Sequence, residues 1–293
     1  MNFIKLKAYG KINLGLDVVR KREDGYHEVR MIMQTVNIFD RIEIKKTKSP
    51  DIKIKTNLYY LPTNEDNLVY KSAKLLMEEF DISQGIAIDL KKHIPVAAGM
   101  GGGSSDAAAV LYGVNRMFDL GLSIDDLMKR GVKLGADVPY CLLRGTVLAE
   151  GIGEKLTQLP PMPACSLIIA KPNMSLSTKA VYGKLNANEL NSHPDIDGMV
   201  EAIRQNDLNG VAGRLENVLE TITIPDYPII GELKDFMMKH KALNALMSGS
   251  GPTVFGLYDD EKAARKAYEI LKKKKIVKQL YITSLYNNRR QDK

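Results

Sequence analysis

Residues 95–108 read Pro-Val-Ala-Ala-Gly-Met-Gly-Gly-Gly-Ser-Ser-Asp-Ala-Ala, and four of the five positions from Gly99 to Gly103 are glycine. Because glycine has no side chain, the backbone there can approach a bulky ligand closely. An amphipathic pattern follows at once and predicts a helix from about Ser105 to Phe118. A helix N-terminus presents free N–H groups and the positive end of the helix dipole, so it attracts anions. The stretch therefore predicts a phosphate-binding loop that runs into a helix.

Three other kinds of glycine-rich loop fit this stretch less well. A P-loop would place a lysine and a hydroxyl residue after its spacer, and no lysine follows here. A dinucleotide-binding loop would follow an apolar strand, whereas Lys91, Lys92 and His93 precede this one. In such a loop an acidic residue further along the chain would bind the ribose, and only its distance in sequence from the glycines supports Asp119 in that role. A flexible loop with an ordinary helix cap is the remaining alternative, but such loops seldom run straight into so strong a helical pattern.

Alternating and helical patterns extend over the whole chain. Strands are predicted at residues 4–8, 12–18, 41–45, 51–55, 166–170, 243–247, 253–257 and 279–286. Helices are predicted at residues 67–80, 105–118, 178–185, 199–204 and 229–239, with one more after Ser123 and another before the last strand. We expect Asn64 or Asp66 to cap the helix at 67–80, and Gly135 to end the helix after Ser123. Because strands and helices mix without a strict βαβ order, the predicted fold class is α+β.

The 293 residues are enough for two domains. The proline-rich segment 156–164 is the predicted boundary, which gives an N-terminal domain of residues 1–158 and a C-terminal domain of residues 159–293.

Alternation in the first strands also predicts which side chains share a face. Ile12 to Val18 alternate apolar and polar residues, so Lys11, Asn13 and Asp17 are expected together on the opposite face of the strand.

Composition limits the class of protein. Hydrophobic residues make up 44% and charged residues 26%, as in ordinary globular proteins, and no apolar stretch approaches a membrane-spanning length. The N-terminus alternates apolar and basic residues and lacks a signal-peptide core. These features predict a cytoplasmic protein with no membrane partner. Cys141 and Cys165 are too few for a disulfide framework or zinc site and are expected to be buried.

The formal net charge of +7 is compatible with two kinds of partner. Basic proteins bind nucleic acid or small anions. The lysine run 272–275 ends a helical pattern and has no interleaved aromatic residues, so it reads as a solvated helix terminus. The charge fits a phosphate-rich ligand, and no nucleic-acid partner is expected.

Five segments in order resemble the motifs of the GHMP kinase superfamily. The first, second and third superfamily motifs are similar to residues 8–14, 95–108 and 248–255, and residues 24–27 and 135–139 resemble segments of the members that act on a cytidylated methylerythritol. The resemblance covers almost the whole chain. It implies a two-domain fold, with an N-terminal domain of the ribosomal-protein-S5 type (domain 2) and a ferredoxin-like α+β C-terminal domain.

The resemblance also implies the roles of two polar residues. Lys11 would lie beside the acceptor hydroxyl and the γ-phosphate, and Asp137, expected in a loop just past a helix, would accept the hydroxyl proton. An ordinary carboxylate is a weak base for an alcohol, but it suffices where proton transfer is late. From the residues alone, a strand lysine is usually a surface residue and an aspartate before Val-Pro a turn or cap residue.

The remaining site residues implied by the resemblance bind substrate and ATP. Asn13 would orient the acceptor, His27 would hydrogen bond the cytosine with Tyr26 alongside, and Tyr182 would stack on it. Met33 would supply an apolar contact where some members have a second aromatic ring. The residues expected around ATP are Asn64, Asn67, Leu68, Pro95, Gly99, Gly101, Gly102, Gly103, Ser104 and Ser105. Mg²⁺ is expected with ATP, held by phosphates, water and hydroxyls such as those of Ser104 or Ser105.

The implied activity is transfer of the γ-phosphate of ATP to the 2-hydroxyl of 4-diphosphocytidyl-2-C-methyl-D-erythritol, in isoprenoid biosynthesis. Another kinase of the superfamily, of the homoserine or mevalonate type, is the alternative among enzymes. A basic nucleic-acid-binding protein is the alternative from another class, and it has no use for a glycine-rich anion loop.

Overall fold

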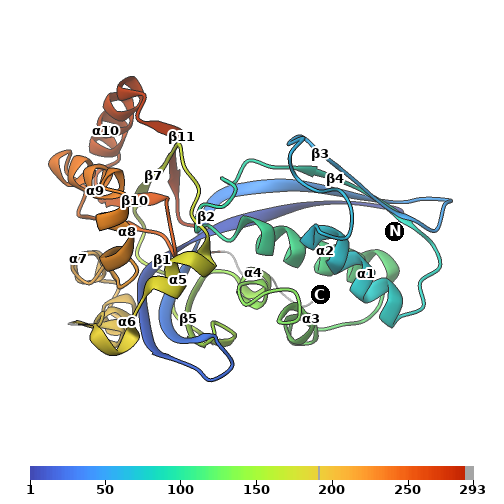
Figure 1. The fold of residues 1–293 in the computed structure, drawn as a ribbon. Coiled ribbons are helices and arrows are strands. Elements are labelled where there is room, and N and C mark those ends of the chain that lie inside the picture. The colour runs from blue at the N-terminus through green and yellow to red at the C-terminus, as the bar shows by residue number, and fades with distance from the viewer. Residues whose placement is uncertain (191, 288–293) are drawn as a thin grey trace.

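The structure of the chain is a computed structural model, and it describes residues 1–190 and 192–287. The described residues form two β-sheets with helices packed on them (Figure 1). The predicted α+β class is therefore confirmed.

The first sheet is built on a long antiparallel hairpin. Its strands are β1 (Phe3–Lys21), β2 (His27–Lys46), β3 (Ile52–Thr56), β4 (Ile86–Lys91), β5 (Thr146–Gly151), β6 (Lys155–Gln158) and β8 (Glu216–Asn217). The order is β3-β4-β2-β1-β8, and β5 pairs with β2 and β6. Helices α1 (Leu68–Glu79), α2 (Gly102–Phe118), α3 (Ile124–Gly131) and α4 (Val138–Leu143) lie together along one face of the β1–β2 ribbon (Figure 1).

The second sheet has the order β11-β7-β10-β9. Its strands are β7 (Ser166–Pro172), β9 (Asn244–Met247), β10 (Val254–Tyr258) and β11 (Val277–Ser284). The helices of this half are α5 (Thr178–Lys184), α6 (Ile196–Arg204), α7 (Leu208–Gly213), α8 (Glu220–Asp226), α9 (Ile229–Lys239) and α10 (Glu261–Lys274), with a short 3₁₀ turn at Ala187–Glu189.

The two halves of the chain are joined by more than a linker. The chain passes from β6 in the first sheet to β7 in the second across residues 159–165. However, β8 comes from the second half and pairs in parallel with β1. The division into residues 1–158 and 159–293 therefore stays a prediction.

Bulges in the β1–β2 hairpin change which side chains share a face. The pairing register shifts between Asn13 and Gly15, and a bulge of this kind re-aims the side chains that follow it. Ile12 lies in one buried cluster and Leu16 in the other. The prediction that Asp17 shares a face with Lys11 and Asn13 is therefore wrong, because alternation was assumed to continue unbroken.

Several helix boundaries also differ from the prediction. The N-cap of α1 is Asn67, whose side chain accepts a hydrogen bond from the N–H of Val69, so the cap is neither Asn64 nor Asp66. The predicted capping box of Ser123 is confirmed, but α3 ends at Gly131, before Gly135.

Two corrections concern the elements that carry the site. Helix α2 begins at Gly102, three residues before the predicted Ser105, because Gly101 takes the left-handed N-cap conformation (φ 64°) and its carbonyl accepts a hydrogen bond from the N–H of Ser105 (2.8 Å). Helix α4 was not predicted, and Asp137 is its N-cap residue. Asp137 thus lies at the start of a helix rather than in a loop after one.

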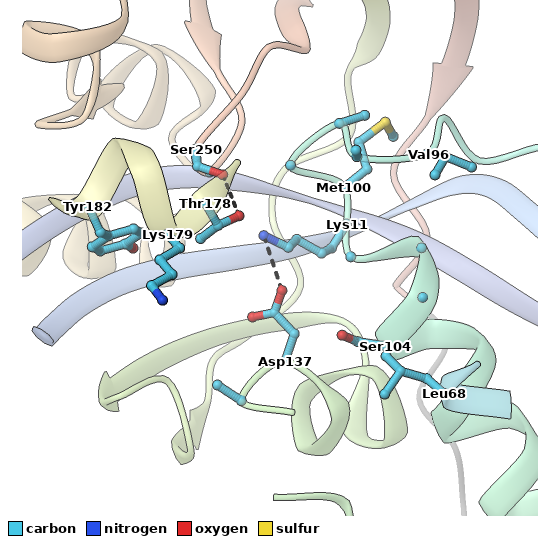
Figure 2. Close-up of a pocket in the computed structure, with 18 of the residues that line it drawn as sticks. Lys11, Leu68, Val96, Met100, Ser104, Asp137, Thr178, Lys179, Tyr182 and Ser250 are labelled. Carbon is cyan, nitrogen blue, oxygen red and sulfur yellow. Dashed lines mark hydrogen bonds and ion pairs between the residues drawn. The ribbon is translucent and has the colours of Figure 1, made fainter. Parts of the chain in front are cut away.

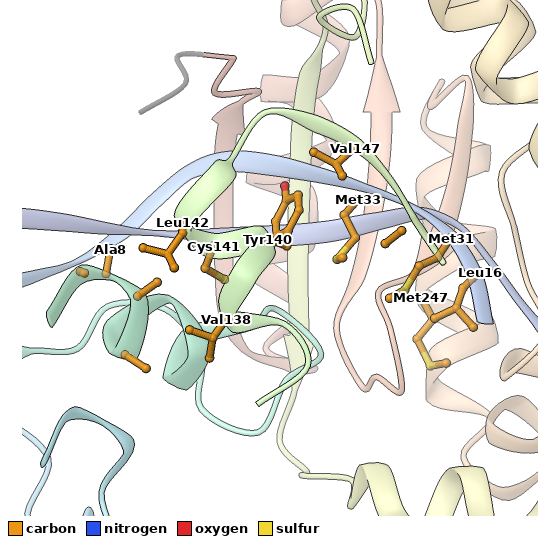
Figure 3. Close-up of a cluster of buried hydrophobic side chains, with 14 of the residues drawn as sticks. Ala8, Leu16, Met31, Met33, Val138, Tyr140, Cys141, Leu142, Val147 and Met247 are labelled. Atoms are coloured by element: carbon orange, nitrogen blue, oxygen red, sulfur yellow. The ribbon is translucent and has the colours of Figure 1, made fainter. Parts of the chain in front are cut away.

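A continuous core holds the two halves together. Figure 3 shows Val138 and Leu142 of α4 packed near Ala8 of β1, while Leu16, Met31 and Met247 meet at the other end of the same cluster. Met247 belongs to β9 of the second sheet and Leu16 to β1 of the first, so apolar burial fixes the position of one sheet against the other.

In the described ranges, 1–190 and 192–287, no helix is both long enough and apolar enough to cross a bilayer.

Candidate active site

A cleft of about 1170 Å³ lies between the glycine-rich loop, strands β1 and β2, helix α5 and the turn at residues 248–251. Figure 2 shows the side chains that meet there, with Met100 from the loop, Ser104 from the start of α2, Lys11 from β1, Asp137 from the N-cap of α4 and Tyr182 from α5. The segments come from both halves of the chain, so the fold assembles the cleft.

The glycine-rich loop is anchored by backbone contacts at several points. The N–H of Lys11 donates to the carbonyl of Met100 (3.0 Å), and the hydroxyl of Ser248 donates to the carbonyl of Gly99 (2.9 Å). A Cβ on Gly99 would lie 2.0 Å from the carbonyl oxygen of Ser248, where φ is +72°. Only glycine fits this contact, so the loop is held rigidly against the 248–251 turn.

The first turn of α2 faces the cleft with unused donors. Its N-cap, Gly101, has no side chain to bind them. The N–H groups of Gly102, Gly103 and Ser104 precede the first intrahelical bond, which begins at Ser105. All three residues line the cleft. Three N–H groups at the positive end of a 17-residue helix form an anion site suited to phosphate oxygens.

Lys11 and Asp137, which are far apart in the sequence, meet in the cleft. The ammonium of Lys11 lies 3.6 Å from a carboxylate oxygen of Asp137 (Figure 2). It also donates a hydrogen bond to the side-chain oxygen of Asn13 (2.7 Å). The side chain of Lys11 is 6% exposed and that of Asp137 is 29% exposed. A buried cation is thus fixed beside a carboxylate that a ligand can reach.

A second ion cluster lies under the loop and is almost fully buried. Lys92 contacts Asp40 and, at 2.6 Å, Asp106 of α2. Burial lowers the pKa of Lys92, but the charges of Asp106 and Asp40 outweigh it and raise that pKa overall. Burial raises the pKa of Asp106 well above its ordinary value, although Lys92 opposes the shift. Asp40 also accepts from the backbone N–H of Ile94 (2.8 Å), so the cluster ties the end of β4 to the start of α2.

The far end of the cleft carries aromatic groups. The rings of His27 and Tyr182 lie 5.3 Å apart at 45°, and Tyr26 is 59% exposed nearby. Burial, and then the charge of Lys21, lowers the pKa of His27, so the ring is neutral near pH 7. Its Nε2 is buried and has no hydrogen-bond partner among residues 1–190 and 192–287. Burial and the nearby Asp137 raise the pKa of the Tyr182 hydroxyl. A flat, polar-edged ligand would satisfy this group of side chains.

Most of the residues predicted for the site line this one cleft. They are Lys11, Asn13, Tyr26, His27, Asn67, Leu68, Pro95, Gly99, Gly101, Gly102, Gly103, Ser104, Asp137 and Tyr182. Their roles are not settled by position and remain predictions.

Three predicted residues lie elsewhere. Met33 is fully buried in the core (Figure 3), and Met31, two residues earlier on the same strand, lines the cleft instead and accepts a hydrogen bond from Asn13 (3.2 Å). The hydroxyl of Ser105 is buried and donates to the carbonyl of Tyr9 (2.7 Å), because α2 has already turned it away from the cleft. Asn64 caps a turn through the N–H of Asp66 (3.2 Å), outside the cleft lining.

Several residues that line the cleft were not predicted from the sequence. Thr178 and Lys179 lie four and three residues before Tyr182, and this helical spacing was the available signal. The hydroxyl of Thr178 lies 2.9 Å from that of Ser250, across the two segments (Figure 2). Lys92 directly precedes the loop region, but its buried carboxylate partners could not be seen from spacing.

Comparisons with known proteins identify the family of the chain. The sequence profile of the GHMP kinases N terminal domain matches residues 67–145, and that of the GHMP kinases C terminal region matches residues 192–277. A 4-diphosphocytidyl-2-C-methyl-D-erythritol kinase of Lachnoclostridium phytofermentans is 57% identical over 99% of each chain. A crystal structure of 4-(cytidine 5'-diphospho)-2C-methyl-D-erythritol kinase superposes with a TM-score of 0.82 at 30% identity, covering 97% of this chain and 100% of the other.

A homoserine kinase from Cytophaga hutchinsonii superposes with a TM-score of 0.80 at 22% identity, covering 98% of this chain and 96% of the other, which shows a shared fold alone. The much higher identity to the cytidylated-substrate kinases decides the family. The chain belongs to the 4-diphosphocytidyl-2-C-methyl-D-erythritol kinase family of GHMP kinases.

Proposed function

We propose that the protein transfers the γ-phosphate of ATP to the 2-hydroxyl of 4-diphosphocytidyl-2-C-methyl-D-erythritol, giving the 2-phosphate and ADP. The observation that carries this proposal is one cleft that combines a phosphate cradle, the Lys11–Asp137 pair and the His27–Tyr182 pair. Family membership at 57% identity supports the same substrate.

Phosphoryl transfer depends on positioning and on neutralising charge. The N–H groups of Gly102, Gly103 and Ser104 would bind the phosphates of ATP at the start of α2. Asn67 and Leu68, at the start of α1, line the same part of the cleft and would contact the nucleoside.

At the point of transfer, Lys11 and Asp137 have complementary tasks. The buried ammonium of Lys11 stabilises negative charge on the transferring group. The carboxylate of Asp137 accepts the proton of the acceptor hydroxyl as the new P–O bond forms. Asn13 holds the ammonium of Lys11 in place through its side-chain oxygen (2.7 Å), which keeps the cation aimed at the reacting atoms.

The residues present also fit Mg²⁺ bound through ATP. Among the described residues, no group of three or more His, Cys, Asp or Glu side chains could hold a metal ion. Mg²⁺ usually keeps several waters and binds through substrate phosphates and one or two protein ligands, and it neutralises phosphate charge. The hydroxyl of Ser104 lines the cleft, so Ser104 is the side chain that would hold the ion, together with phosphate oxygens and water.

The cytosine would occupy the aromatic end of the cleft. The Nε2 of neutral His27, which has no partner in the part of the chain that the structure describes, offers a hydrogen bond to the base. Tyr182 offers one stacking face. Met31 supplies an apolar contact there in place of the predicted Met33. We also place the enzyme in the cytoplasm, where ATP is available.

A substrate panel tests the proposal. ATP-dependent ADP release is measured with diphosphocytidyl-methylerythritol, methylerythritol phosphate, homoserine, mevalonate and galactose. The proposal requires turnover of the cytidylated compound and little of the others. Turnover of homoserine or mevalonate alone would move the assignment to another GHMP kinase and leave the fold unchanged.

The panel has a matched pair of variants. His27→Ala and Tyr182→Ala should raise the KM for the cytidylated substrate and leave the KM for ATP near its wild-type value. An unchanged KM for the cytidylated substrate in both variants would remove the cytosine from this end of the cleft.

A further inference from the structure

The cleft is lined by four lysines, and two of them already contact carboxyl groups. Lys11 is paired with a carboxylate at 3.6 Å, and Lys92 is held by two buried carboxylates. Lys21 and Lys179 also line the cleft. Across residues 1–190 and 192–287, the structure gives neither of these two a salt bridge or a side-chain hydrogen bond. In the described part of the chain, Lys21 and Lys179 are thus the two cleft lysines without a carboxylate partner.

The position of Lys179 is the more informative. It is the second residue of α5 and comes three residues before Tyr182, so the two side chains lie on one face of the helix. In Figure 2, the Lys179 side chain extends from α5 into the space between the Tyr182 ring and Asp137. Lys21, by contrast, is the cross-strand partner of His27 and lies at the base end of the cleft.

The substrate of the proposed function must place a charged group in that space. Its cytosine would lie against Tyr182 and His27, and its reacting hydroxyl beside Lys11 and Asp137. The diphosphate that joins the two parts has to cross the interval, with negative charge on both phosphates. An unpaired ammonium in that interval is the expected complement of such a group.

We propose that Lys179 binds the diphosphate of the cytidylated substrate and makes that diphosphate part of substrate selection. The inference rests on the proposed function. Lys179 acts in binding: it distinguishes a cytidine diphosphate ester from an uncharged alcohol and takes no part in moving the proton or the phosphoryl group.

A lysine on an exposed helix is often only a solvated surface group, and the same helix supplies the control for that possibility. Lys184 lies five residues further along α5, is paired with Asp226 at 2.7 Å and does not line the cleft. Lys179→Met and Lys184→Met remove the same charge from the same helix and leave a good helix former in place.

The test measures binding of cytidine and of cytidine diphosphate by calorimetry, with the ATP site filled by a non-hydrolysable ATP analogue. Wild-type protein and the Lys184→Met variant should bind the diphosphate more tightly than the nucleoside. Because the Lys179 side chain is exposed before binding, we expect Lys179→Met to reduce that preference by about 10-fold rather than abolish it. Its affinity for cytidine should stay unchanged, and Lys179→Arg should keep most of the preference.

Each contrary result has its own meaning. If wild-type protein binds neither cytidine nor its diphosphate, the proposed function fails and the inference falls with it. If wild-type protein binds both and Lys179→Met keeps the full preference, the inference alone is wrong. If Lys21→Met loses the preference for the diphosphate and Lys179→Met keeps it, the diphosphate binds at Lys21 and the inference is wrong. If Lys179→Met loses affinity for cytidine and for cytidine diphosphate to the same extent, Lys179 acts at the base, which also contradicts the inference.

Discussion

The variant Gly103→Ala separates the phosphate cradle from the stability of the fold. Gly103 is the second residue of α2, and a Cβ there would lie 3.6 Å from the nearest heavy atom, a methyl carbon of Leu68. That is an ordinary van der Waals distance, so the folded protein can accommodate the methyl group. Alanine is more favourable than glycine in a helix by up to about 1 kcal/mol. The variant should therefore unfold at the same temperature as the wild type or slightly above it.

ATP binding should change in the opposite direction. Gly103 lines the cleft, and the methyl group would occupy space where a phosphate approaches the N–H groups of the first helical turn. Displacing the phosphate from one charge-assisted hydrogen bond costs about 1.5–3 kcal/mol, which corresponds to roughly 10- to 100-fold in affinity. The dissociation constant for Mg·ATP is measured by calorimetry, and the free energy of unfolding by urea titration of the same preparations.

The matched control for Gly103→Ala is Gly213→Ala. Gly213 is the last residue of α7, and a Cβ there would meet no heavy atom of residues 1–190 and 192–287 within 4 Å. This control should leave ATP affinity unchanged. Wild-type ATP affinity in Gly103→Ala would refute the reasoning that the start of α2 binds the phosphates. A large loss of stability in that variant would refute the steric argument.

Two further predictions concern the loop and the charges beneath it. Gly99→Ala places a Cβ 2.0 Å from a backbone oxygen and should lower kcat/KM by about 100-fold through displacement of the loop. Gly121 has a similar φ of +71°, and a Cβ there would have no described atom within 4 Å, so Gly121→Ala should cost only about 1 kcal/mol of stability. Similar kcat/KM values in the two variants would contradict the importance of the Gly99 contact. Because the pKa of Asp106 is raised in the folded state, the folded protein keeps a proton that the unfolded chain releases, so the unfolding free energy should fall as pH rises above about 4. Urea titrations across this pH range should show a weaker fall in the unfolding free energy for Asp106→Asn than for the wild type. The control is Asp125→Asn, which changes an exposed carboxylate on α3 and should behave as the wild type does. An identical pH dependence in all three proteins would show that Asp106 is not its source.

The glycine-rich loop and its helix could be predicted because their signals are local. Glycine spacing, the hydroxyl pair and the apolar stripe all lie within residues 95–118. The start of α2 was placed too late because glycine has low helix propensity, and the left-handed Gly101 that allows the helix to begin at Gly102 is a backbone conformation that composition does not reveal.

The features that could not be predicted depend on contacts between distant segments. The bulge after Asn13 separates Asp17 from Lys11, and no alternation pattern signals where a bulge occurs. Met31 and Met33 are two residues apart on β2, so strand alternation places both side chains on the same face. Only the packing of the core decides which of them reaches the cleft.

The meeting of Lys11 with Asp137 across the cleft was obtained from family resemblance. Helical periodicity and spacing carried no information about it. The buried partners of Lys92 were missed for the same reason, because Asp40 and Asp106 lie 52 and 14 residues away from it in the chain.

The most direct test of the account is the rate of the chemical step in Asp137→Asn, measured by rapid quench with ATP and the cytidylated substrate both saturating. Removing a general base typically costs 10²- to 10⁴-fold, so we expect a fall of about 10³-fold with little change in the affinity for either substrate. Asp66→Asn, which changes another carboxylate lining the cleft, should keep the wild-type rate. A near wild-type rate in folded Asp137→Asn would contradict the claim that phosphoryl transfer takes place at the Lys11–Asp137 pair.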